Sequence, residues 1–154
     1  ILGISIINIT HAQELSFYEL EHIKKMEISE VPEYMNSKAF KFEKTFSEKQ
    51  GKYKSIVWIA IINNEAFYLS ILTDAKTDDI KAINYSMNDK NLNDKIKKQI
   101  EGKYELDRIE YLSDKMMYLY FSDNLEFSVS IRSENSEYNT YQIQIFDLNT
   151  FHDF

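Results

Sequence analysis

The sequence predicts an α+β fold in which two helix-plus-four-stranded antiparallel sheet units pack as one domain, with the helices on one sheet face. Apolar residues recur at helical spacing in two places, near residues 17–23 and 92–100. Each place is followed by four segments whose apolar residues alternate with polar ones or form short runs, as in β-strands. The 154 residues include 3 Gly and 1 Pro, so no flexible linker separates the units.

The first unit is predicted to open with two short helices. Ser16 and Glu19 fit a capping box at the start of an apolar stripe over residues 17–23. Ser29 is the predicted cap of the second helix, where Pro32 is tolerated because the first turn has no intrahelical donors to lose.

Four strands of the first unit are expected to follow. Alternation over residues 40–46 predicts a half-buried strand, and residues 55–62 are apolar on both faces. Asn63-Asn64 is a good turn dipeptide, which makes residues 66–72 the hairpin partner of that apolar run. Residues 80–87 give the fourth strand.

The second unit repeats this order. Asn91 is the predicted cap of a helix that carries apolar residues every four positions, and Gly102 supplies its end. Short polar separators then divide four further predicted strands, at residues 104–112, 116–121, 125–132 and 140–146.

This order suggests an internal duplication, with halves at residues 13–88 and 89–154. Residues 67–71 (FYLSI) echo residues 127–131 (FSVSI) at the third strand of each half. Chance similarity between two amphipathic strands is the alternative explanation.

The uncharged stretch at residues 1–12 fits the remnant of a signal peptide. Its apolar run to Ile9 matches the hydrophobic region, and Ala12 offers the small residue before a cleavage site. We therefore expect a secreted or periplasmic protein whose folded domain spans residues 13–154. An N-terminal β-strand is the alternative, since Ile-rich runs also form strands.

Composition excludes several classes of protein. The net charge of −7 disfavours nucleic acid and anionic lipid. No cysteine is present, which removes disulfides, thiolate zinc sites and cysteine nucleophiles. No apolar run approaches 18 residues, so no membrane span is expected.

Catalytic residue types are scarce, and we expect neither enzymatic activity nor a cofactor or metal. The chain has 3 His and no hydrolase, phosphate-binding or dinucleotide-binding motif. Asp74, Asp78 and Asp79 lie in one predicted loop but lack the Gly and the distal Glu of an EF-hand. We interpret them as a solvated turn.

The sharpest functional hypothesis concerns one face of the predicted sheet. The face expected to pack against the helices consists of Val57, Ile59, Ile61, Phe67, Leu69, Ile71, Met117, Leu119 and Phe121. The opposite face then carries a predicted partner-binding set, namely Trp58, Tyr68, Tyr118, Tyr120, Arg132, Gln142 and Gln144. Tyr, Trp and Arg dominate binding hot spots. The alternative is that the N-terminal segment, the other half or a second copy packs on this face.

Two resemblances accompany these patterns. Residues 15–23 (LSFYELEHI), 31–35 (VPEYM) and 38–43 (KAFKFE) resemble the opening of a group of small secreted proteins from Gram-negative bacteria with no known activity. The duplicated helix-and-sheet order is similar to the beta-lactamase-inhibitor-protein fold. That resemblance implies a concave, aromatic-lined sheet that grips a protein partner.

We therefore expect an exported, non-enzymatic protein that binds a protein or peptide partner through an aromatic sheet face. One alternative is an immunity-type protein that neutralises a basic toxin. Others are a structural homodimer that uses the same face, and a hydrolase that uses carboxylates such as Asp78 or Asp79.

Overall fold

The computed structural model describes residues 13–112, 115–122, 125–132 and 140–148. The predicted signal peptide at residues 1–12 lies outside them. The fold is α+β, as predicted. The elements are α1 (Phe17–Lys24), α2 (Val31–Ser37), β1 (Lys41–Glu48), a 3₁₀ turn (Lys49–Gly51), β2 (Tyr53–Ile62), β3 (Glu65–Asp74), β4 (Ile80–Met87), α3 (Lys90–Glu101), β5 (Leu106–Leu112), β6 (Lys115–Ser122), β7 (Leu125–Arg132) and β8 (Thr140–Asp147).

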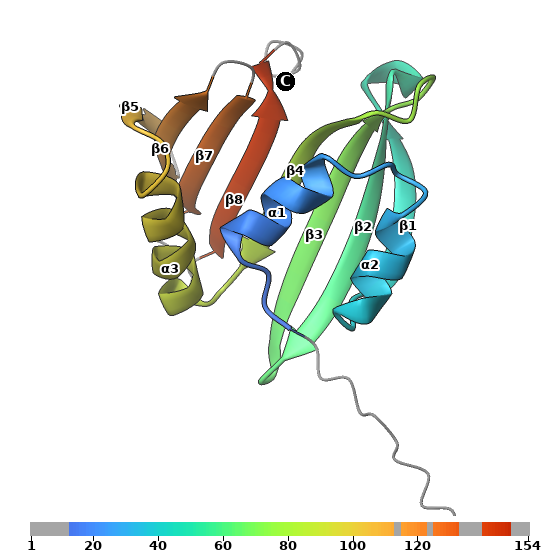
Figure 1. Cartoon of the computed structure of the whole chain (residues 1–154), viewed down its shortest axis with the longest axis horizontal. Coiled ribbons are helices and arrows are strands. Elements are labelled where there is room, and N and C mark those ends of the chain that lie inside the picture. Colours follow the sequence, from blue (N-terminus) through green and yellow to red (C-terminus); the bar gives the residue numbers. More distant parts are fainter. Residues whose placement is uncertain (1–12, 113–114, 123–124, 133–139, 149–154) are drawn as a thin grey trace, which may run out of the picture.

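Eight antiparallel strands form one sheet in the order β1-β2-β3-β4-β8-β7-β6-β5, and the helices pack on one of its faces (Figure 1).

The sheet is continuous across the boundary between the two predicted halves. β4 pairs with β8 through residues such as Ile83 with Ile145 and Asn84 with Gln144. α1 contacts β4, β8 and α3, so it lies over this junction (Figure 1). The duplication of the two halves stays a prediction.

The capping box of α1 is confirmed. The Ser16 hydroxyl accepts a hydrogen bond from the Glu19 N–H at 3.3 Å, and the Glu19 carboxylate accepts one from the Ser16 N–H at 2.7 Å. Lys38, at the end of α2, donates to the same carboxylate. Burial alone would raise the pKa of Glu19, but the hydrogen bonds from Lys38 and Ser16 outweigh it and hold the pKa below its ordinary 4.5.

Replacing Glu19 with glutamine should therefore lower stability in a pH-dependent way. At neutral pH we expect the free energy of unfolding to fall by about 1 kcal/mol. A carboxyl whose pKa is lower in the folded than in the unfolded protein stabilises the fold at pH values above its unfolded pKa. That stabilisation is lost as the pH falls through the folded-state pKa. Urea titrations from about pH 7 down to about pH 2 should show the gap between wild type and variant closing below 4.5. The exposed Glu27→Gln variant is the matched control; a gap that stays constant down to the lowest pH would contradict the assignment.

Two predicted caps and one predicted burial pattern are wrong. α2 begins after Glu30 rather than Ser29, and no side chain caps it. α3 begins after Asp89, whose carboxylate accepts hydrogen bonds from the N–H groups of Asn91 and Leu92, so Asp89 takes the role predicted for Asn91.

β1 is exposed almost throughout rather than half-buried, because it is an edge strand with β2 as its neighbour in the sheet.

The core lies between the helices and the sheet. It combines apolar side chains of α1, α2 and α3 with alternate residues of the central strands. Trp58, Leu69, Tyr85 and Ile143 are examples from β2, β3, β4 and β8. The sheet face that turns away from the helices, called here the helix-free face, carries the remaining alternate residues.

Candidate functional site on the helix-free sheet face

The strand register identifies the residues of the helix-free face. Paired residues on antiparallel strands have side chains on the same face. Ile59 pairs with Tyr68, Tyr68 with Ser86, and Ser86 with Gln142. These four residues therefore form one row across β2, β3, β4 and β8.

An apolar patch lies at the end of this face near the β2–β3 turn. We define the hairpin patch as Ile59, Ile61 and Tyr68. Ile61 is 61% exposed and Tyr68 is 45% exposed, and Ile59 is half-buried between strands. Among the helices in the described residues none packs on it. Clustered exposed apolar side chains of this kind are a common mark of an interaction surface.

A polar row lies beside the hairpin patch. We define the amide row as Ser70, Asn84 and Gln144, which pair with one another across β3, β4 and β8. The hydroxyls of Ser70 and Ser55 lie 2.8 Å apart. The buried Asn84 Oδ1 has no hydrogen-bond partner in the described part of the chain. The row thus places neutral polar side chains next to exposed apolar ones.

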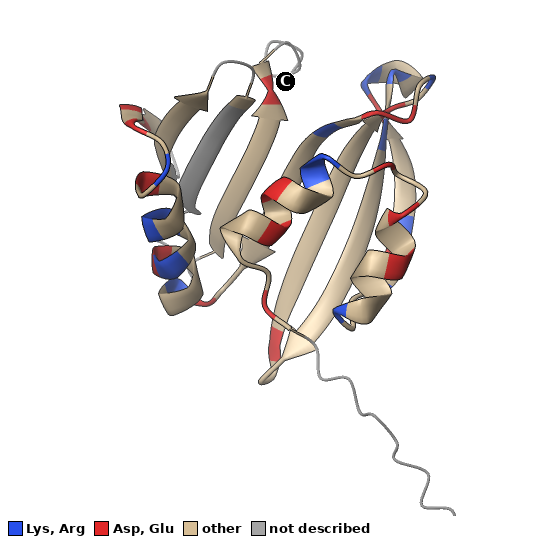
Figure 2. Cartoon of the chain, viewed as in Figure 1, with Lys and Arg blue, Asp and Glu red and all other residues tan. Residues whose placement is uncertain are grey.

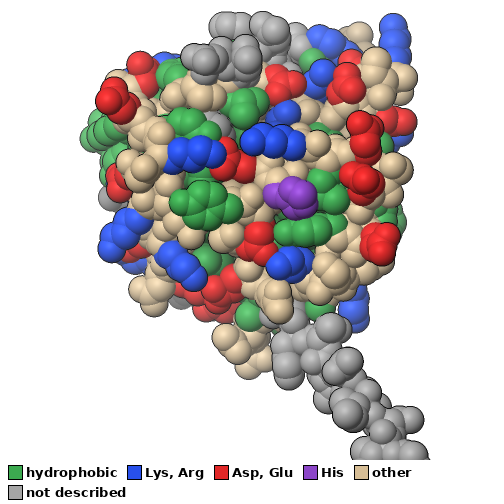
Figure 3. All heavy atoms as spheres, in the orientation of Figure 1, with side chains coloured by type: hydrophobic (Ala, Val, Ile, Leu, Met, Phe, Trp, Pro, Cys, Tyr) green, Lys and Arg blue, Asp and Glu red, His purple; other side chains and the backbone are tan. Residues whose placement is uncertain are grey.

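The centre of this face is uncharged. The charges of β3, β4 and β8 are confined to Glu65, Asp74, Lys81 and Asp147, at or next to strand ends, while charged residues gather on the helices and turns (Figure 2). The helix side of the molecule differs, since charges of both signs are scattered among apolar side chains there (Figure 3). The central part of the helix-free face, on β3, β4 and β8, therefore suits a partner with neutral polar and apolar groups.

Three predicted partner-binding residues meet on this face. Tyr68 and Gln142 share one row, and Gln144 belongs to the next. Arg132 ends β7 and pairs with Thr140 of β8, but its side chain lies outside what the structure describes.

The placement of Trp58, Tyr118 and Tyr120 on that face is wrong. All three side chains lie on the helix side. Trp58 is 4% exposed and belongs to the core. Tyr120 is fully buried and donates a hydrogen bond to Glu101 of α3 at 3.3 Å.

Tyr118 packs beneath α3. The ammonium of Lys97 lies 4.1 Å from the centre of its ring, a distance typical of a cation–π contact.

Tyr120 is the neighbouring buried tyrosine under the same helix. Burial, and to a smaller extent the nearby Glu101 carboxylate, raises the pKa of the Tyr120 hydroxyl above its usual value. Both tyrosines thus anchor a helix to the sheet.

Six of the residues predicted for the helix-packed side also lie on the opposite face of the sheet. Val57, Ile59 and Ile61 of β2, together with Met117, Leu119 and Phe121 of β6, alternate with the helix-facing residues and lie on the helix-free face. The sequence interpretation therefore missed Ile59 and Ile61 as candidate binding residues. Phe67, Leu69 and Ile71 were assigned correctly to the helix side.

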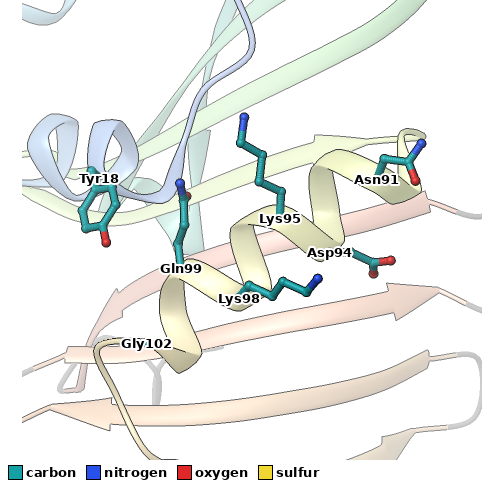
Figure 4. Close-up of a pocket in the computed structure, with 7 residues that line it drawn as sticks. All are labelled: Tyr18, Asn91, Asp94, Lys95, Lys98, Gln99 and Gly102. Carbon is teal, nitrogen blue, oxygen red and sulfur yellow. The ribbon is translucent and has the colours of Figure 1, made fainter.

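A hollow lies between α1 and α3 and has a volume of about 620 Å³ (Figure 4). Tyr18, Lys95 and Lys98 are exposed around it. Gln99 uses its side-chain oxygen to accept a hydrogen bond from the Phe17 N–H at 3.0 Å. The Gln99 side chain therefore already holds the start of α1.

No metal-binding cluster of three His, Cys, Asp or Glu side chains occurs within the described residues. The described helices are also too short or too polar to cross a membrane. Comparison with known proteins gives no match: no family model, no curated protein and no solved structure matches this chain. The two resemblances drawn from the sequence therefore stay predictions.

Proposed function

We propose that this chain is an exported, non-enzymatic protein that binds a protein or peptide partner through the helix-free face of its sheet. The observation that carries the proposal is the exposure of Ile61 and Tyr68 beside the amide row. A tyrosine with an apolar body and a hydroxyl tip is a favoured anchor at binding interfaces.

The chemistry of the face indicates what the partner offers. Apolar side chains of the partner would remove the hairpin patch from water, and neutral polar groups of the partner would lie against the amide row. The uncharged centre provides no ion pair for a strongly basic partner. We therefore favour a neutral binding segment over the basic toxin of the immunity-type alternative.

A photo-crosslinking experiment tests the proposal. A crosslinkable amino acid at position 61 should trap one polypeptide from a native cell-envelope fraction. The same amino acid at Tyr111, which is 76% exposed on β5, is the matched control and should not trap it. A self-crosslink at position 61 together with a dimer in sedimentation would identify a homodimer and overturn the proposal.

With the purified partner, Tyr68→Ala should weaken binding by about 30-fold, as for a central hot-spot residue. Tyr111→Ala should change the dissociation constant by less than about twofold, because Tyr111 lies at the far edge of the sheet. Calorimetry would measure both. Equal effects of the two substitutions would exclude the hairpin patch as the binding site.

A further inference from the structure

The strand β1 forms one edge of the sheet. It pairs with β2 on one side, and within the described residues no strand pairs with its other side (Figure 1). The free backbone groups of such an edge are a template on which another strand can pair. Two large apolar side chains are exposed on β1, Phe42 at 55% and Phe46 at 43%, which increases this tendency.

The regular part of β1 covers residues 44–48. The register with β2 shifts just before it, so a bulge separates it from the start of the strand. Lys44 pairs with Val57, a residue of the helix-free face, and side chains alternate between the faces along a strand. Three side chains of this part therefore lie on the helix-free face, namely Lys44, Phe46 and Glu48. The other two, Thr45 and Ser47, lie on the helix side.

This part of β1 is complementary to a second copy of itself. In antiparallel pairing about a twofold axis at Phe46, Lys44 lies opposite Glu48 of the second copy, and Thr45 lies opposite Ser47. Each of these pairs occurs twice, and the two Phe46 side chains face each other. Opposite charges, aromatic pairs and Thr–Ser pairs are all stabilising across antiparallel strands.

Neighbouring registers lack this complementarity. An axis at Thr45 places Lys44 opposite Phe46, and an axis at Ser47 places Glu48 opposite Phe46. Neither register brings Lys44 to Glu48. The pattern of side chains therefore selects the axis at Phe46.

The two charged groups needed for this pairing are available. Neither Lys44 nor Glu48 takes part in an ion pair with another described residue, and the Lys44 ammonium lies 5.7 Å from the centre of the Phe46 ring. The other edge strand, β5, differs, since Arg108 already donates to Asp107 and Glu110 of its own strand. The free charges thus favour β1 over β5 as the edge that pairs.

We propose that this chain forms a homodimer in which the β1 strands of two copies pair antiparallel about Phe46. Residues 41–48 carry two Lys and two Glu, so two copies can meet at this neutral edge although each has a net charge of −7. The same strand contributes from both copies, so the assembly closes at two. The inference is independent of partner binding, because residues 44–48 pair with one end of β2 and the hairpin patch lies at the other.

Charge reversal tests the pairing. Lys44→Glu alone places carboxylates opposite carboxylates, and Glu48→Lys alone places ammonium groups opposite ammonium groups. Each variant should therefore weaken the dimer by about tenfold in sedimentation equilibrium. A mixture of the two variants should recover the wild-type affinity, because every contact between unlike copies then joins an ammonium group to a carboxylate. Recovery in the mixture also shows that both variants are folded.

Lys41→Glu is the matched control. It makes the same change of charge on the same strand, but Lys41 precedes the bulge, so the dissociation constant should change by less than about twofold. A wild-type protein that stays monomeric up to about 1 mM would overturn the proposal. So would a mixture that binds no more tightly than the separate variants, or a Lys41→Glu effect as large as that of Lys44→Glu. Growth beyond a dimer would indicate that β1 pairs with β5 of the next copy and would exclude the twofold pairing.

Discussion

Tyr85→Ala is expected to lower the free energy of unfolding by about 3–5 kcal/mol, the range for a large aromatic side chain removed from a core. Tyr85 is fully buried on β4, at the junction of the two halves of the sheet. Its ring stacks on Phe67 with centres 6.1 Å apart and lies 6.5 Å from Phe40. Urea denaturation followed by circular dichroism would measure the loss.

Tyr85→Phe separates the ring from the hydroxyl. The hydroxyl accepts a hydrogen bond from the Leu15 N–H at 3.3 Å, so its removal should cost about 1 kcal/mol. Burial raises the pKa of this hydroxyl. Above pH 10.0, the ordinary pKa, the unfolded tyrosine ionises while the buried one stays protonated, so stability should decline as the pH rises past that value. The control is Tyr111→Ala, because Tyr111 is exposed. If Tyr85→Ala lowered the free energy of unfolding no more than this control does, Tyr85 would not be important for the stability of the core.

The element order could be predicted because each helix and strand is encoded locally. Period-two alternation, short apolar runs and polar turns indicated all eight strands, and the Ser16–Glu19 pair marked the first helix. Caps were harder, because Asp89 and Asn91 are both suitable cap residues and two positions separate them. The choice depends on backbone geometry at the helix start.

The sheet faces could have been predicted from the turn. A two-residue turn at Asn63 and Asn64 pairs Ile62 with Glu65, and counting outward then pairs Trp58 with Leu69. Residues that pair share a face, so Trp58 must accompany Leu69 on the helix side. The composition of β2 concealed this, since it is apolar on both faces and its period gives no direction.

The pairing of β4 with β8 could not be predicted from local pattern. It joins segments about sixty residues apart, and nothing in either strand specifies the other as its neighbour. The position of α1 over this junction is equally non-local. Lys24 shows how it is held: its ammonium donates to the Ile80 carbonyl and to the Asp147 carboxylate, both at 2.7 Å.

Glu21 provides the second attachment of α1. It is 6% exposed, yet its carboxylate accepts hydrogen bonds from Lys103 Nζ at 2.9 and 2.8 Å and from the Tyr104 hydroxyl at 2.8 Å. Both donors follow α3, so this carboxylate connects α1 to the second half of the chain. The Glu21 carboxylate raises the pKa of Lys103 by accepting its hydrogen bond.

Glu21→Ala should therefore lower the free energy of unfolding by about 2–3 kcal/mol, because hydrogen bonds to a charged acceptor are lost and the Tyr104 hydroxyl is left without that acceptor. Lys103→Ala should cost about 1 kcal/mol, since the Lys103 side chain is 42% exposed and its pairing competes with water. Urea denaturation of both single variants and of the double variant gives the coupling energy. The exposed Glu33→Ala variant should stay within about 0.5 kcal/mol of wild type. Additive losses in the double variant would show that Glu21 and Lys103 act independently and that the attachment of α1 depends on packing alone.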